Sequence, residues 1–105
     1  MSNLVLDTIA ARRSHRAYQD KPLSQEHIDL MLKAFLESPS AINKQPWHIS
    51  VVRSKKLLDE MNEAIRSEVM KRDAAARSPR FADSAFHVFY HAPLVFFLSA
   101  DPAWR

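Results

Sequence analysis

Three guanidinium groups and one hydroxyl lie within five residues, in the run Arg12-Arg13-Ser14-His15-Arg16. A guanidinium presents a planar fork of N–H donors that matches the oxygens of a phosphate, so this cluster could hold a phosphate group with side chains alone. The alternative interpretation is a solvated basic turn, because runs of charge usually lie on the surface. His15 is assigned no role.

A second group of candidate residues is the run 39–47, which reads Pro-Ser-Ala-Ile-Asn-Lys-Gln-Pro-Trp. Asn43 and Gln45 carry both hydrogen-bond donors and acceptors, Ser40 adds a hydroxyl, and Trp47 adds a flat apolar face. This set suits recognition of the edge of a planar heterocycle. The run also fits an ordinary turn with a buried tryptophan, in which Asn43 and Gln45 fix the loop by bonding to its backbone.

The composition excludes several familiar sites. The chain has 105 residues, 47% hydrophobic and 26% charged, which indicates one globular domain spanning residues 1–105. It contains no Cys, and this excludes disulfides, thiolate zinc sites, iron–sulfur ligation and a cysteine nucleophile. It also contains no Gly, and this excludes the glycine-rich loops that let backbone amides approach a phosphate.

The spacing of apolar residues predicts the elements that must position the two groups. Helical periodicity behind Ser2 or Asn3, behind Ser24 and behind Ser54 predicts three helices with those residues as N-caps. Strand-like patterns predict two strands. The expected elements are helices over about 3–12, about 24–37 and from Ser54 to a frayed end at Asp73–Ala76, before Ser78-Pro79, and strands at His48–Arg53 and Leu94–Leu98.

The order helix, helix, strand, helix, strand predicts an α/β or α+β fold. A strand buried on both faces needs partners on both edges, and only one other strand is available within the chain. We therefore expect another segment or another subunit to supply further strands.

His87 and His91 are four residues apart, within a run, 81–91, that we interpret as a short helix rather than a strand. On a helix they would share one face, a spacing that can bind a metal. No carboxylate or third histidine stands at a supporting spacing, so we interpret the pair as two unrelated polar residues and predict no metal site.

The two groups of residues together resemble the nitroreductase family of flavin-dependent oxidoreductases. That family has a helix leading into an R-R-S-x-R motif, then an amphipathic helix and a P-S-x-x-N-x-Q-P-W motif, and residues 12–16 and 39–47 match these patterns. The run 48–52 and the apolar run after Ala92-Pro93 also resemble the family's strands. The resemblance covers roughly residues 4–100. It implies an α+β nitroreductase-like fold, an intertwined homodimer and FMN bound at the dimer interface.

The resemblance also implies roles for individual residues. The FMN phosphate and ribityl chain would be held by Arg12, Arg13, Ser14 and Arg16. The isoalloxazine ring, often contacted from the neighbouring subunit, would lie near Pro39, Ser40, Ala41, Asn43 and Gln45. NAD(P)H would reduce the flavin, and a nitroaromatic, a quinone or a similar small molecule would accept the electrons. Because the cofactor performs the redox step, no catalytic acid or base is expected from the chain.

Members of the family normally run well beyond 105 residues. We therefore expect this sequence to be the N-terminal portion of a nitroreductase-like domain, and the other interpretation is a half-length protein that assembles by dimerisation. The longest apolar run, Leu94–Leu98, is too short to span a bilayer, and the N-terminal residues lack the order of a secretory signal. A cytoplasmic location is expected.

Two other functions stay open from the sequence. The net charge of +3 and the clustered cations at Lys71, Arg72, Arg77 and Arg80 are compatible with a basic nucleic-acid-binding module. Against it, acidic residues are interspersed and no aromatic RNA-binding signature is present. The third interpretation is a ligand-free, truncated fragment without activity.

Overall fold

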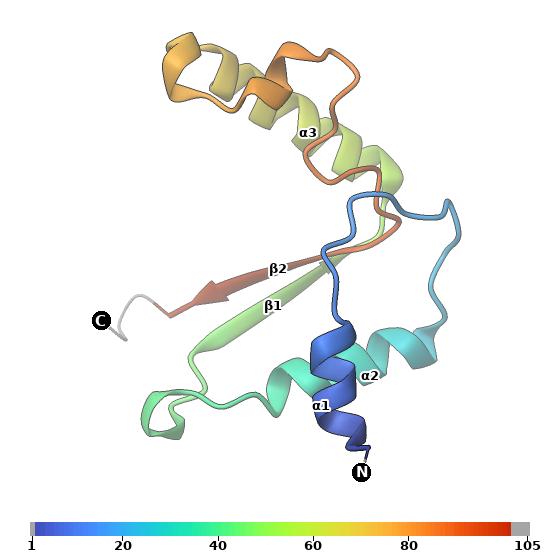
Figure 1. Ribbon diagram of the computed structural model, residues 1–105. Helices are drawn as coiled ribbons and strands as arrows, with labels where there is room; N and C mark the ends of the chain where they lie inside the picture. Colours follow the sequence, from blue (N-terminus) through green and yellow to red (C-terminus); the bar gives the residue numbers. More distant parts are fainter. Residues whose placement is uncertain (1, 102–105) are drawn as a thin grey trace.

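A computed structural model describes residues 2–101 of the chain (Figure 1). The order helix, helix, strand, helix, strand is confirmed, and the class is α+β because the two strands pair antiparallel. The main elements are α1 (Leu4–Ala11), α2 (Gln25–Leu36), β1 (Trp47–Val52), α3 (Lys55–Met70) and β2 (Val95–Ala100). Short 3-10 turns occur at Ala41–Asn43, Ala74–Ala76 and Pro79–Ala82.

A side-chain cap begins each α-helix, as the sequence predicts. In each case an oxygen of the capping side chain accepts a hydrogen bond from a backbone N–H in the first turn, which has no partner inside the helix. The pairs are Asn3 with Val5 and Leu6, Ser24 with His27, and Ser54 with Leu57, at 3.1 to 3.2 Å.

Strands β1 and β2 form a two-stranded antiparallel sheet. Trp47 lies opposite Ala100 at one end and Val52 lies opposite Val95 at the other. The run 94–98 is expected to be covered on both faces, yet Leu98 is 58% exposed. Within the described residues this sheet has two open edges, and the expected further strands stay a prediction.

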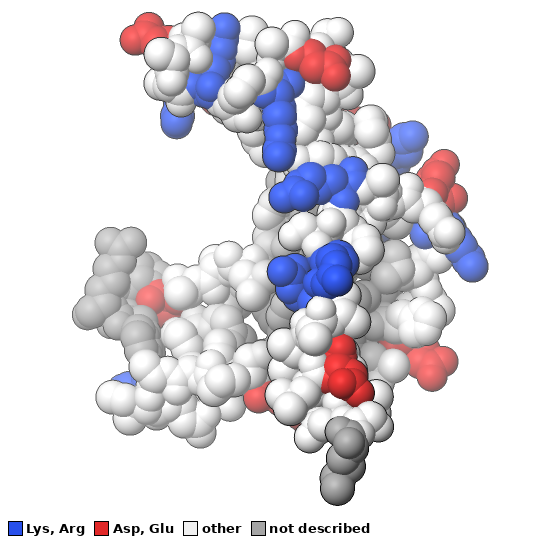
Figure 2. All heavy atoms as spheres, viewed as in Figure 1, with Lys and Arg blue, Asp and Glu red and all other residues white. Residues whose placement is uncertain are grey.

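The chain has an open shape. Its radius of gyration is 17.3 Å, against about 13 Å for a compact domain of about 100 residues. Figure 2 shows a hollow between the region of α3 above and the sheet with α1 and α2 below.

Among the described residues, only two apolar side chains are buried, Ile28 and Leu58, each 3% exposed. The predicted apolar face of α1 is exposed, with Leu4 at 81%.

The predicted short helix over 81–91 is wrong for most of its length. Only the turn at Pro79–Ala82 is helical, and residues 83–91 form successive turns.

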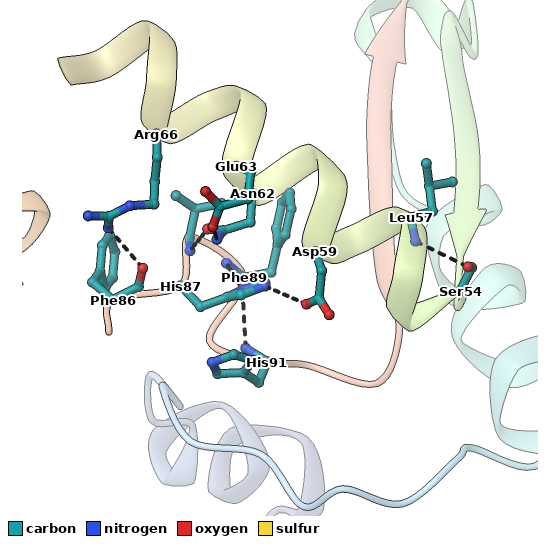
Figure 3. A network of polar contacts seen from close by, with 11 residues as sticks. Ser54, Leu57, Asp59, Asn62, Glu63, Arg66, Phe86, His87, Phe89 and His91 are labelled. Carbon is teal, nitrogen blue, oxygen red and sulfur yellow. Dashed lines mark hydrogen bonds and ion pairs between the residues drawn. The ribbon is translucent and has the colours of Figure 1, made fainter. Parts of the chain in front are cut away.

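Side chains of α3 hold these turns in place. The Arg66 guanidinium donates to the carbonyl oxygens of Phe81, Asp83 and Phe86 at 3.4, 3.3 and 3.0 Å. The buried Asn62 accepts the N–H of Val88 at 2.8 Å. Figure 3 shows both side chains facing the turns. Hydrogen bonds from α3 therefore replace those of a local helix.

Candidate functional site

The basic cluster lies directly after α1, in the extended connector that leads toward α2. Arg13 is already engaged there, because its Nη1 donates to the carbonyl oxygens of Ala10 and Arg12 at 2.9 and 2.8 Å. These carbonyls lie at the end of α1, where backbone acceptors lack helical partners. Arg13 thus caps two carbonyls at the end of α1, whose last turn is followed by the non-helical backbone of Arg12.

The other members of the cluster have side chains that are free to bind a ligand. Arg12, Ser14 and Arg16 are exposed, and their side chains make no hydrogen bond or ion pair with another residue in the range 2–101. In Figure 2 basic side chains gather near the end of α1, where the connector begins in Figure 1. Two unpaired guanidiniums on one short segment are suited to an anion such as a phosphate.

The loop of the second motif has a strained backbone. Ile42, Asn43 and Gln45 have φ angles of 55°, 52° and 52°, in the left-handed region that favours glycine. A β-branched residue such as Ile42 is strongly disfavoured in this region, and strain of this kind is concentrated at functional sites. The sequence carried no signal for it, because Ile42 is among the last residue types expected there.

The Ser40 hydroxyl closes this loop by accepting the N–H of Gln45 at 2.9 Å. The side chains of Asn43 and Gln45 make no hydrogen bond with any other described residue, so neither fixes the loop. Pro39 and Ala41 are also exposed beside them. The loop therefore presents an exposed row of amide and apolar groups on a backbone held by Ser40.

One chain does not bring the two motifs together. In Figure 1 the loop 39–45 lies beyond the C-terminal end of α2, whereas residues 12–16 lie beyond the C-terminal end of α1, well away from it. One ligand could contact both motifs only if each motif came from a different copy of the chain, or if a further segment of protein bound the ligand between them.

Three of the four cations that favoured nucleic-acid binding have partners within the fold. Lys71 pairs with Glu68 at 2.9 Å. Arg77 donates to the carbonyl oxygens of Met70 and Arg72 at the end of α3, at 3.2 and 3.4 Å. Arg80 bonds the hydroxyl of Tyr90 at 2.7 Å. Each of these three cations therefore has a partner within the chain, although the Lys71–Glu68 pair is exposed and contributes little to stability.

The profile of the nitroreductase family matches residues 9–105, which include both motifs and all the main elements from the end of α1 onward. The chain belongs to the nitroreductase family. A relative in Archaeoglobus fulgidus, whose name proposes an NADH dehydrogenase or NAD(P)H nitroreductase activity, is 45% identical over 71 residues, which are 68% of this chain and 41% of that protein. A Bacillus subtilis protein named as an FMN reductase of the NAD(P)H type is 33% identical over 61 residues, 58% of this chain and 24% of that protein.

Solved nitroreductase structures share the fold. The nitroreductase of Bacteroides fragilis, determined with bound FMN, superposes with a TM-score of 0.87 at 34% identity, over 96% of this chain and 54% of that one. The FMN-bound nitroreductase of Desulfitobacterium hafniense gives 0.86 at 28% identity, over 98% of this chain and 55% of that one. This chain therefore spans about half the length of these structures, and less of the curated relatives. Within residues 2–101, none of the helices has the length and apolar character needed to cross a membrane.

Proposed function

We propose that this chain is the FMN-binding N-terminal portion of an oxidoreductase that takes electrons from NAD(P)H. The observation that carries the proposal is the pair of unpaired guanidiniums, Arg12 and Arg16, that follow α1 in a chain of the nitroreductase family. The FMN-bound nitroreductases of similar fold support it. The domain assignment, residues 1–105 as one part of a nitroreductase-like domain, belongs to the same proposal, as does the cytoplasmic location.

The residues of the two motifs fit FMN in different ways. Arg12 and Arg16 would bind the phosphate with charged hydrogen bonds, and the Ser14 hydroxyl would add a donor toward the phosphate or the ribityl chain. Arg13 would act less directly, because its guanidinium already holds the end of α1. Asn43 and Gln45 would bond polar atoms at the edge of the isoalloxazine ring, with Pro39, Ser40 and Ala41 beside it.

The cofactor would supply the redox chemistry when bound, receiving hydride from NAD(P)H and passing electrons to a nitroaromatic, a quinone or a similar small acceptor. The protein's part is to hold the phosphate end and to position the ring edge. For this reason none of the side chains is proposed as a catalytic acid or base.

A homodimer is part of the proposal. The apolar face of α1 is exposed in the single chain, with Leu4, Val5 and Ile9 all more than half accessible. Burying such side chains against a second copy would stabilise the assembly by about 1.5 to 3 kcal/mol each. The two motifs lie apart in one chain, so pairing two copies would let the loop 39–45 of one copy approach residues 12–16 of the other.

Comparison of FMN with riboflavin tests the proposal, since the two differ only by the phosphate. We expect FMN to bind the chain at least 10-fold more tightly than riboflavin, and the preference to shrink at high salt because charge attraction is screened. The FMN-loaded chain is then mixed with NADH or NADPH and a quinone, and oxidation of the nucleotide is followed by absorbance. Equal affinity for the two flavins would contradict the phosphate role of Arg12 and Arg16.

The same chain distinguishes the two alternative functions. A steep salt dependence of oligonucleotide binding without flavin binding would favour the nucleic-acid-binding function. A folded chain that binds neither an oligonucleotide nor a flavin would favour the inactive fragment.

A further inference from the structure

A cluster of three possible metal ligands lies beside α3. Asp59 of that helix meets His87 and His91 of the turns 83–91, although Asp59 and His87 are 28 positions apart in the sequence. One ligand atom from each of the three lies within 4.8 Å of the other two. Asp59 Oδ1 is 3.1 Å from His87 Nε2, and the two imidazole rings are 4.2 Å apart between centroids. Figure 3 shows Asp59 reaching from α3 toward His87, with His91 below it.

The turns 83–91 place His87 and His91 beside Asp59 of α3. Asn62 and Arg66 hold the backbone of these turns against α3. His91 has a left-handed backbone with φ of 55°, which turns the chain back so that its ring stacks at 36° to that of His87. His87 is 6% exposed, whereas His91 is open to solvent. Hydrogen bonds and ring contacts therefore bring the two imidazoles and the carboxylate together at one place beside α3.

We propose that this cluster binds a divalent transition metal ion of the Zn²⁺ class. Two imidazoles and one carboxylate are the donors that Zn²⁺ accepts, whereas Mg²⁺ and Ca²⁺ prefer oxygen ligands alone. Three protein ligands leave a fourth position for water. Asp59, His87 and His91 all line a cavity of about 320 Å³, which gives an ion access from solvent.

Binding requires a proton to move on His87. Its Nδ1 accepts the backbone N–H groups of Phe89 and His91 at 3.2 and 3.4 Å, so the neutral ring carries its proton on Nε2 and donates it to Asp59. The metal takes the electron pair of Nε2, and the proton moves to Nδ1. The hydrogen bonds from the backbone N–H groups of Phe89 and His91 to Nδ1 then break. The bond from Phe89 is at the long end of the usual range for N–H donors and the bond from His91 is beyond it, so neither is a strong hydrogen bond.

Titration of the 105-residue chain with Zn²⁺, in the absence of FMN, tests this inference separately from flavin binding. Calorimetry measures the affinity, and amide NMR resonances report on Phe89 and His91. The cluster variants are Asp59→Asn, which keeps an oxygen acceptor for His87, and His91→Asn, because asparagine tolerates a left-handed backbone. The controls are Glu63→Gln, a nearby carboxylate on α3 outside the cluster, and His48→Asn, an exposed imidazole on β1.

We expect one Zn²⁺ per chain, affinity at least 10-fold lower in each cluster variant, no change in either control, and shifted amide resonances of Phe89 and His91. Equal Zn²⁺ affinity in the parent chain and both cluster variants would overturn the inference. So would binding that leaves these two amide resonances unmoved. If a cluster variant fails to fold, the parent chain alone decides, because Co²⁺ in such a site gives visible absorption bands and their absence rejects the site.

Discussion

The hydroxyl oxygen of Ser40 accepts the backbone N–H of Gln45 at 2.9 Å and so closes the loop that presents the second motif. Between these two residues, Ile42 and Asn43 adopt left-handed backbone conformations without any glycine. The loop is thus held in a strained conformation by one side chain, and its amide side chains remain exposed.

Replacing Ser40 with alanine is expected to loosen this loop. The Gln45 N–H loses its acceptor, and we expect FMN affinity to fall 3- to 10-fold because the ring contacts are no longer pre-positioned, at a cost of about 1 kcal/mol. Titration of flavin fluorescence measures the affinity. Ser50→Ala, at an exposed position on β1, is the matched control and should behave like the parent chain. An unchanged FMN affinity in Ser40→Ala would reject this role of the loop.

Ile42→Asn is expected to stabilise the chain. Asparagine adopts a left-handed backbone more easily than a β-branched residue, and Ile42 is 89% exposed, so little packing is lost. The free energy of unfolding in urea should rise by about 1 kcal/mol. Lys44→Asn is the control, because Lys44 already has an ordinary right-handed conformation with φ of −69°. A less stable Ile42→Asn chain would show that the isoleucine side chain contributes packing instead.

Arg12→Ala and Arg16→Ala are each expected to weaken FMN binding by about 1.5 to 3 kcal/mol per lost charged hydrogen bond, and to leave riboflavin binding unchanged. Lys56→Ala removes an exposed cation at the start of α3 and serves as the control. Arg13→Ala should instead reduce helicity, because its guanidinium bonds two carbonyls at the end of α1. Circular dichroism and flavin titration separate these effects. An equal loss of FMN and riboflavin affinity in Arg12→Ala would argue against a phosphate contact.

Arg66→Lys keeps the charge but removes the fork that bonds three carbonyl oxygens of the turns 81–86. An ammonium group is a compact donor and cannot reproduce this geometry. We expect the free energy of unfolding to fall by about 1 to 3 kcal/mol. Urea unfolding measures it, with Arg72→Lys at an exposed position as the control. Equal stability of the two variants would mean that the turns are held by other contacts.

Ile9→Glu places a charge on the exposed apolar face of α1, where the proposed second copy would pack. Burying an unpaired carboxylate is costly, so we expect a shift from dimer to monomer. Sedimentation velocity measures the change, and Asp7→Glu on the same helix is the control. A parent chain that is already monomeric at high concentration would contradict the dimer.

Local signals in the sequence predicted the secondary structure well. Asn3, Ser24 and Ser54 cap the helices, and the alternating run after Pro46 forms β1, because capping and periodicity are properties of neighbouring residues. The turns 83–91 were missed because Asn62 and Arg66, which hold them, lie on α3 and act through tertiary hydrogen bonds. The exposure of α1 was also missed, since periodicity shows an apolar face but not what covers it.

The candidate site was only partly predictable for the same reason. The residue types at 12–16 and 39–45 pointed to phosphate and heterocycle binding, but the guanidinium of Arg13 bonds two carbonyls at the end of α1. His87 and His91 lacked a supporting carboxylate at helical spacing, whereas the fold supplies Asp59 from a distant element. Contacts between distant residues depend on topology, which spacing alone does not encode.

The most direct test of the central proposal is the visible absorption spectrum of the purified chain after incubation with FMN and gel filtration. We predict that flavin absorbance co-elutes with the protein at the size of a dimer, and that Arg12→Ala retains less of it. A folded chain that elutes without flavin absorbance would contradict the proposal that this chain binds FMN.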